Sequence, residues 1–206
     1  LKSDFTDAKE YGSIINVNPV NFEALFARLD DIAEMKDPGA FELFYKAEAI
    51  DKFLPFLKQS AVMAQKYDVV VTNPPYMGSS GMNDKLSKFV KENYPDSKSD
   101  LFAVFIEKGF SMTKKCAYNY MVTMQSWMFL SSFEKLRVRI LTSKTITNLM
   151  HMENMVMGIA FGTAVSIFKN YTIKGFKGTY NQIKLKDIED GTPKVFPVKG
   201  NRFANV

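Results

Sequence analysis

Cysteine, histidine and tryptophan each occur only once in this sequence of 206 residues. The single cysteine, Cys116, excludes an internal disulfide bond and is typical of a protein in a reducing cytoplasm. The single histidine, His151, precedes a predicted hairpin and is interpreted as structural rather than catalytic. No apolar run is long enough to span a bilayer, and the first residues do not form a signal peptide. We therefore expect a cytoplasmic protein without a membrane segment.

Residues that build a core are abundant. Hydrophobic residues make up 46% of the chain and aromatic residues 14%, so the composition excludes general disorder. The length is sufficient for one domain, or for one domain and part of a second. The formal net charge is +5 and the isoelectric point is near 9.1. The chain opens at Leu1 without a methionine and ends at Val206 in mid-pattern, and we expect it to be a fragment.

One short segment organises the rest of the chain. The β-branched run Val69–Val71 is too short for a helix and predicts a buried parallel strand. Pro74 and Pro75 end this strand, because neither has a backbone N–H to donate to a neighbouring strand. The Asn73 amide and the Tyr76 ring are then expected at the carboxyl end of the strand, where open α/β sheets bind their ligands. The alternative interpretation of this Asn-Pro-Pro-Tyr motif is a plain turn.

The motif, placed after an apolar strand, resembles the catalytic motif of amino-methyltransferases that use S-adenosylmethionine. The resemblance implies that Asn73, Pro74, Pro75 and Tyr76 are catalytic. The Asn73 side-chain oxygen and the Pro74 carbonyl would accept hydrogen bonds from an exocyclic amine, which pushes electron density onto the nitrogen that attacks the methyl group. Tyr76 would offer a face on which a flipped-out base stacks. Neither a metal ion nor a covalent enzyme intermediate is needed.

Strand and helix patterns alternate after the motif, which predicts a mostly parallel sheet. Further strands are expected at Tyr118–Gln125, Thr145–Met150 and Gly158–Phe168, and helices at 84–93, 100–110 and 132–141. Before the motif, one helix is expected from Pro19 with Asn18 as its cap, and a second is expected to kink or split at Pro55. The segment Gly12–Val17 is interpreted as a short strand.

The order of these elements narrows the resemblance. The similar segments are Asn73–Ser80, Asp100–Glu107 and Met124–Glu134. They resemble adenine-specific DNA methyltransferases and, more specifically, the phage-defence BREX methyltransferases of the PglX type. The resemblance implies an α/β class protein with a partial Rossmann-like, S-adenosylmethionine-dependent methyltransferase fold, whose mostly parallel sheet carries a C-terminal antiparallel hairpin strand. It also divides the chain into a mostly helical N-terminal segment packed on the core (1–66), the second half of the catalytic core (67–170) and a basic, β-rich extension leading towards a target-recognition domain (171–206).

The same resemblance implies roles for further residues. Asp100 and Phe105 would bind the cofactor, with Phe105 lining its adenine pocket; the alternative interpretation is a helix cap and a core phenylalanine. Phe161 would bind the flipped base, and Met157 is the other residue that could cover it. Residues 77–83 are interpreted either as a loop that moves over the site or as a flexible connector.

The glycine-rich loop in which such enzymes bind S-adenosylmethionine is absent before Asn73. We therefore infer that the first half of the cofactor site lies upstream of Leu1 in the parent protein. The chain alone is expected to bind the cofactor weakly or not at all, and to be inactive. One edge of the sheet would be uncovered, which favours self-association.

The expected partners are duplex DNA with a flipped adenine and other subunits of a phage-defence system. The basic residues of the C-terminal extension either contact DNA phosphates or solvate a linker: Lys174, Lys177, Lys184, Lys186, Lys194, Lys199 and Arg202. Two other functions stay open. One is methylation of an RNA base or a protein glutamine, and the other is an inactive module that binds DNA or a partner protein.

Overall fold

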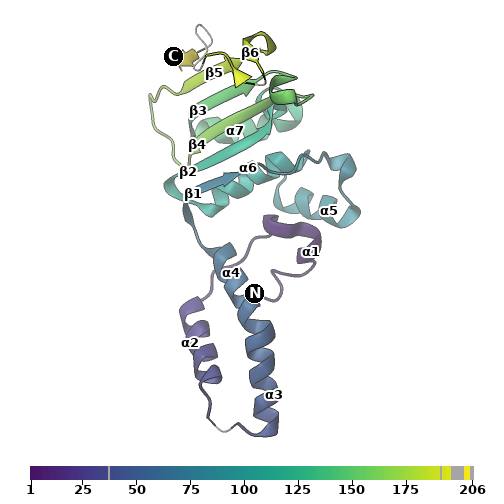
Figure 1. Cartoon of the computed structure of the whole chain (residues 1–206), viewed down its shortest axis with the longest axis vertical. Coiled ribbons are helices and arrows are strands. Elements are labelled where there is room, and N and C mark those ends of the chain that lie inside the picture. The colour runs from purple at the N-terminus through teal and green to yellow at the C-terminus, as the bar shows by residue number, and fades with distance from the viewer. Residues whose placement is uncertain (37, 191, 196–201, 205–206) are drawn as a thin grey trace. The chain divides into compact units, whose positions relative to one another are not determined.

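The computed structural model of the chain describes residues 1–36, 38–190, 192–195 and 202–204 (Figure 1). It divides into two compact units, Leu1–Gln65 and Lys66–Val206. The first unit is helical, and the second contains the sheet and the Asn-Pro-Pro-Tyr motif. Among the described residues, no helix combines the length and the apolar character needed to cross a membrane.

The helices of the N-terminal unit are α1 (Ala8–Tyr11), α2 (Phe22–Ala33), α3 (Ala40–Glu48) and α4 (Leu54–Ala64). The predicted start of the first long helix is wrong, because α2 begins at Phe22 and not at Pro19. Asn21, not Asn18, caps α2, since its side chain accepts a hydrogen bond of 3.0 Å from the backbone N–H of Ala24. Asn18 instead donates through its backbone and its side chain to the Asp4 carboxylate, at 3.0 Å in both bonds.

Two further predictions concern this unit. The predicted strand at Gly12–Val17 is wrong: a 3-10 turn covers Gly12–Ile14 and no strand follows in the segment. The predicted split at Pro55 is confirmed, because a π-helical turn, Ala49–Phe53, separates α3 from α4 and the proline lies in the first turn of α4. Proline has no N–H for the helical ladder, so the first turn is where a helix tolerates it.

The strands of the second unit include β1 (Tyr67–Thr72), β2 (Thr113–Met124), β3 (Thr145–Met152), β4 (Thr163–Lys169), β5 (Thr179–Ile183) and β8 (Arg202–Ala204). Within the described residues they form one sheet in the order β1-β2-β4-β3-β5-β8. Strands β1, β2, β3 and β5 run in one direction, and β4 runs against both of its neighbours. This arrangement confirms the predicted mostly parallel sheet with an antiparallel hairpin strand. A small separate ribbon joins β6 (Ile188–Glu189) to β7 (Thr192–Pro193).

Helices α5 (Asp84–Asn93), α6 (Leu101–Met112) and α7 (Glu134–Ser143) belong to the same unit. Helix α6 packs on β1 and β2, and α7 packs on β3, so that both cover one face of the sheet (Figure 1). The core between them consists of Phe102, Ala103, Ile106, Met121, Trp127, Phe133, Leu136, Ile140, Leu149 and Phe168. The helix expected at 132–141 is confirmed as α7, and Phe133, Leu136 and Ile140 at its start and along it are buried in this core.

The first strand differs from its prediction. It is parallel to β2, as expected, but it lies at the edge of the described sheet, and Val69 and Val71 are 50% and 71% exposed. Val70 points to the other face and packs against the core beneath α6. The prediction of a buried strand is therefore wrong for two of the three valines. The physical reason is that the apolar run fits a buried strand, whereas burial depends on neighbours that only one face of β1 has here.

The C-terminal residues form the short β runs that their sequence predicts. Strand β5 pairs in parallel with β3, so residues 179–183 extend the same sheet. The lysines that are exposed are Lys174, Lys177, Lys186 and Lys194, and Lys194 pairs with Glu189 at 3.4 Å. Lys199 and the side chain of Arg202, also named as phosphate contacts, lie outside the described residues.

Candidate functional site

The Asn-Pro-Pro-Tyr motif follows β1 directly, as its sequence predicts. Strand β1 ends at Thr72, whose partner in β2 is Met121. Pro74 is buried, whereas the Asn73 side chain is exposed at the carboxyl end of the strand. The motif therefore holds a polar amide on a turn that two prolines stiffen, with the amide open to a ligand.

Tyr76 links this turn to the neighbouring strand. Its hydroxyl lies 3.2 Å from the side-chain oxygen of Asn73 and 3.1 Å from the backbone carbonyl of Val122. Val122 comes one residue after the last β1–β2 pair. The tyrosine hydroxyl therefore makes the hydrogen bond to β2 that a further residue of β1 would otherwise make. Burial raises the pKa of the Tyr76 hydroxyl, which keeps it protonated and able to donate.

Two phenylalanines surround the Tyr76 ring. Phe102 of α6 meets it edge-on at 6.1 Å between ring centroids, and Phe161 meets it at 5.6 Å with the planes inclined by 69°. Phe102 is buried, whereas Phe161 is 38% exposed. The structure thus brings together two residues that the sequence named for the same base, Tyr76 and Phe161. The side chain of Met157, the alternative to Phe161, lies outside the described residues.

The segment after the motif is fixed to the start of α6. The carboxylate of Asp100 accepts hydrogen bonds of 3.1 Å from the backbone N–H groups of Met77 and Phe102. The backbone N–H of Leu101 donates to the Met77 carbonyl at 3.0 Å, and that of Ser79 donates to the carbonyl of Ser99 at 3.0 Å. These bonds connect Met77–Ser79 to the segment around the start of α6. The two interpretations of residues 77–83, a loop that moves over the site and a flexible connector, stay predictions.

The two residues named for the cofactor differ in how well they fit it. One carboxylate oxygen of Asp100 is already engaged by the two backbone N–H groups, and burial raises the pKa of this carboxyl against the effect of those bonds. Asp100 therefore acts as the N-cap of α6. Phe105, one turn further along α6, is partly exposed and offers an apolar ring to a nucleoside. Within the described residues, Phe105 is thus the better match to an adenine-binding role.

A polar cluster beside Phe161 was not predicted as part of the site. The amide nitrogen of Gln125 donates to the side-chain oxygen of Asn154 at 3.2 Å, and the amide oxygen of Gln125 contacts Nε2 of His151. Burial lowers the pKa of the His151 imidazole, and the nearby Glu153 carboxylate partly opposes this shift. No spacing in the sequence connects these residues. They meet because β2 and β3 both run antiparallel to β4 on either side of it, so that both strands end at the same edge of the sheet.

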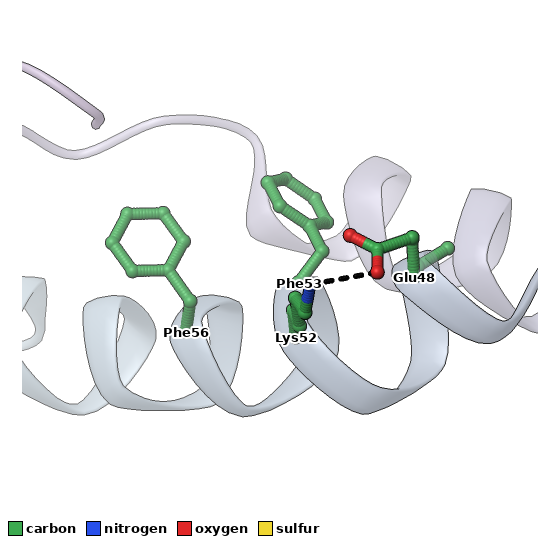
Figure 2. Close-up of a pocket in the computed structure, with 5 residues that line it drawn as sticks. Glu48, Lys52, Phe53 and Phe56 are labelled. Carbon is green, nitrogen blue, oxygen red and sulfur yellow. Dashed lines mark ion pairs between the residues drawn. The ribbon is translucent and has the colours of Figure 1, made fainter. Parts of the chain in front are cut away.

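The N-terminal unit has a separate concavity, of about 460 Å³, lined by Glu48, Ala49, Lys52, Phe53 and Phe56. Figure 2 shows the two phenylalanine rings on one side of the helix, next to the ion pair of 2.7 Å between Lys52 and Glu48. Its polar groups are already paired with each other, so it offers little for orienting a reaction. Among the described residues, no group of three or more histidine, cysteine, aspartate and glutamate side chains is placed to hold a metal ion.

The fold and the site together define a class of protein. The chain is similar to the crystal structure of a modification subunit of a putative type I restriction enzyme from Vibrio vulnificus YJ016, with a TM-score of 0.52. The two are 13% identical, and the match covers 68% of this chain and 34% of that one. The architecture is therefore a partial Rossmann-like methyltransferase fold. The model of the Eco57I restriction-modification methylase family matches residues 6–156, and the chain belongs to that family.

Two curated relatives are similar over most of the chain. The adenine-specific methyltransferase BrxX of Escherichia coli O9:H4 (strain HS) is 39% identical over 186 residues, which is 90% of this chain. The adenine-specific methyltransferase PglX of Lacticaseibacillus casei (strain Zhang) is 34% identical over 185 residues, which is 87% of this chain. The chain spans about 15% of the length of each relative.

Proposed function

We propose that the longer protein that carries this chain transfers a methyl group from S-adenosylmethionine to the exocyclic amine of adenine in duplex DNA. The observation that carries the proposal is the meeting of Asn73, Tyr76 and Phe161 at the carboxyl end of β1. An exposed amide acceptor beside two aromatic rings suits a planar base that bears an amino group. The adenine-specific activity in the names of both curated relatives supports this choice of base.

In this proposal the residues of the motif bind and orient the amine. The Asn73 side-chain oxygen and the Pro74 carbonyl each accept one N–H of the adenine amine, which localises the nitrogen lone pair and aims it. The two prolines fix both acceptors before the base arrives, so that little reorganisation accompanies the reaction. The cofactor, when bound, supplies the electrophilic methyl group.

The aromatic rings receive the base. An adenine within a duplex is stacked and paired, so its amine is reached only after the nucleotide rotates out of the helix. Tyr76 presents a ring to one face of the extruded base, and Phe161, inclined by 69° to it, limits the base on another side. Stacking of a base on an aromatic side chain stabilises the extruded state by about 1–3 kcal/mol.

The cofactor side of the site is less complete in this chain. Among the described residues, Phe105 is available to an adenosyl group, while Asp100 is engaged in capping α6. We therefore propose that the chain alone binds S-adenosylmethionine weakly or not at all. Isothermal titration of the chain with S-adenosylmethionine is expected to give no heat that saturates in the micromolar range, and micromolar binding would overturn this part of the proposal.

The function is tested by transfer of tritiated methyl groups from S-adenosylmethionine to plasmid DNA from a methylation-free host. The longer protein is expected to label the DNA, with the label in N6-methyladenine after digestion, and the chain alone is expected to be inert. Label in another base would contradict the choice of adenine. Inertness of the longer protein on DNA, with label in RNA or protein, would replace DNA as the substrate.

The restriction-modification family to which the chain belongs supports a proposal for the biological setting. We propose that the protein acts in the cytoplasm, in restriction-modification or phage defence, together with other subunits of that system. The exposed lysines of residues 174–194 then contribute contacts to DNA phosphates, which predicts that DNA binding weakens steeply with salt. Strand β1 lies at the edge of the sheet that the described residues form, and this edge would favour self-association of the chain when it is taken alone.

A further inference from the structure

The order of the strands brings Gln125 to the turn that carries Phe161. Gln125 directly follows β2, and its neighbour Met124 pairs with Thr163, the first residue of β4. The backbone N–H of Gln125 donates to the carbonyl of Gly162 at 3.0 Å. This bond lies one residue from Phe161, so it fixes the backbone on which the exposed ring is carried.

The side chain of Gln125 binds the start of the segment that ends at Gly162 and carries Phe161. Residues 153–162 join β3 to β4, and Asn154 stands near their start. The amide nitrogen of Gln125 donates to the side-chain oxygen of Asn154 at 3.2 Å, while its amide oxygen accepts from Nε2 of His151 at the end of β3. One glutamine therefore binds both ends of the connection that presents Phe161.

Gly162 is shaped to receive this side chain. A Cβ atom at Gly162 would lie 2.3 Å from Cδ and 2.4 Å from Oε1 of Gln125. Carbon atoms pack at about 3.5–4.0 Å, so any larger residue would displace the glutamine. The glycine is required here by close approach and not by a left-handed backbone, because its φ is outside the positive range.

From these contacts we infer that Gln125 is a positioning residue, which holds the Phe161 ring beside Tyr76 and so shapes the pocket for the target base. The inference rests on the proposed function. Phe161 is 38% exposed, so packing around the ring is incomplete and its place depends on the backbone beneath it. A ring held in place before the base arrives spares the cost of ordering it during the reaction.

The placement of the ring is tested on the chain itself. A single 4-fluorophenylalanine at position 161 reports the surroundings of the ring through its fluorine resonance. Gln125→Ala is expected to shift this resonance and to change its line width, because both side-chain bonds and the packing on Gly162 are lost. Asn154→Ala removes one bond and is expected to give a smaller shift in the same direction.

Gln182→Ala is the matched control. It removes another amide at these strand ends, which donates to Glu153 at 3.1 Å, but leaves every bond of Gln125 intact. Its fluorine resonance is expected to match that of the parent chain. Thermal unfolding of each variant confirms that the fold is retained. An unchanged resonance in folded Gln125→Ala, or in folded Asn154→Ala where the first variant does not fold, would overturn the inference.

The consequence for catalysis is tested in the longer protein. Gln125→Ala is expected to lower kcat by roughly 10- to 100-fold, the range that a displacement of about 1 Å in a site can produce, with an unchanged KM for S-adenosylmethionine. Because Gln125 acts through Phe161, the double variant with Phe161→Ala is expected to be no slower than Phe161→Ala alone. If the losses in kcat of Gln125→Ala and Phe161→Ala add in full in the double variant, the inference is contradicted.

The two proposals fail in different ways. A wild-type longer protein that methylates no DNA contradicts the proposed function, while the fluorine measurement still decides whether Gln125 positions the ring. An active wild type whose Gln125→Ala variant keeps its kcat leaves the function intact and overturns the inference.

Discussion

The hydroxyl of Tyr76 lies between two oxygen atoms, 3.2 Å from Oδ1 of Asn73 and 3.1 Å from the carbonyl of Val122. A phenol has one proton, and a backbone carbonyl can only accept, so the bond to Val122 directs that proton towards β2. The tyrosine oxygen then accepts a hydrogen bond best if the Asn73 amide turns its NH₂ group towards it. The hydrogen-bond network therefore assigns the orientation of this amide. In this orientation the Asn73 oxygen faces outwards, as the amine of a substrate requires.

Substitution of Tyr76 by phenylalanine tests this relationship. Tyr76→Phe keeps the ring contacts with Phe102 and Phe161 but releases the Asn73 amide. The loss of one orienting hydrogen bond, about 0.5–1.5 kcal/mol, predicts a fall in kcat of roughly 2- to 10-fold with an unchanged KM for DNA. Steady-state methyl transfer by the longer protein measures both. Tyr118→Phe, whose hydroxyl accepts from Lys169 at 3.3 Å elsewhere on the sheet, is the matched control and is expected to keep full activity.

Removal of the amide itself is expected to have a larger effect. Asn73→Ala leaves the strand and both prolines in place but deletes an acceptor that contacts the reacting amine. A directly contacting, preorganised group is worth on the order of 10²–10³ in kcat, so methyl transfer is expected to fall by at least that factor. Asn73 is exposed and is not part of the core, so the variant is expected to keep its fold. DNA binding in a gel-shift assay is therefore expected to be nearly unchanged. Equal losses of DNA binding and of methyl transfer would show that Asn73 has a different role.

The parts of the site that the sequence predicted are those governed by local signals. Two adjacent prolines end β1 in any context, and an aspartate before an apolar helix caps it, as Asp100 does. The place of Phe161 beside Tyr76 came from a family resemblance and not from local physics. The role of Gln125 needed the sheet order, because its partners, His151 and Asn154, come from a strand end that β4 separates from β2.

Burial was harder to predict than strand position for a related reason. An apolar triplet such as Val69–Val71 has the same sequence whether one face or both faces are covered. The alternation within the strand, with Val70 inward and its two neighbours outward, depends on where α6 packs. At the start of α2, Asn21 is the cap while Asn18 bonds to Asp4, a contact across fourteen residues that no local pattern contains.

A buried glycine in α6 gives a test of the core beneath the site. A Cβ atom at Gly109 would lie 2.5 Å from Cε of Met121 and 2.6 Å from the side-chain amide of Asn119. Alanine gains about 1 kcal/mol of helix propensity over glycine, whereas overpacking a filled core costs about 1–3 kcal/mol. Since Asn119 and Met121 are both buried, the clash is expected to exceed the gain, and Gly109→Ala is expected to destabilise the chain by up to about 2 kcal/mol.

Urea unfolding measures this free energy. The matched control is Lys88→Ala on the exposed side of α5, which changes helix propensity without touching the core and is expected to shift the free energy by less than about 0.5 kcal/mol. Greater stability in Gly109→Ala would show that Met121 moves aside freely and that the packing between α6 and β2 is looser than its geometry indicates.

A buried lysine in the same helix gives the last prediction, a dependence of stability on pH. Lys108 is 4% exposed, and burial, reinforced by repulsion from Lys66, lowers the pKa of its ammonium group from 10.5 to about 8. A lowered pKa means that the folded state holds the proton less tightly than the unfolded state. The unfolding free energy is therefore expected to rise as the pH increases from about 8 towards 10.5. As the pH falls back to about 8, the same gain in unfolding free energy is lost, because the buried Lys108 amine becomes charged.

Lys108→Met removes the titrating group and keeps the length of the side chain. Relative to this variant, the unfolding free energy of the parent chain is expected to gain about 2 kcal/mol between about pH 7 and about pH 9.5. The comparison cancels the other groups that ionise in that range, because both proteins contain them. Lys88→Met, at an exposed position, is expected to follow the parent chain at every pH. A parent and a Lys108→Met variant whose urea midpoints move in parallel would show that the lysine reaches solvent in the folded state.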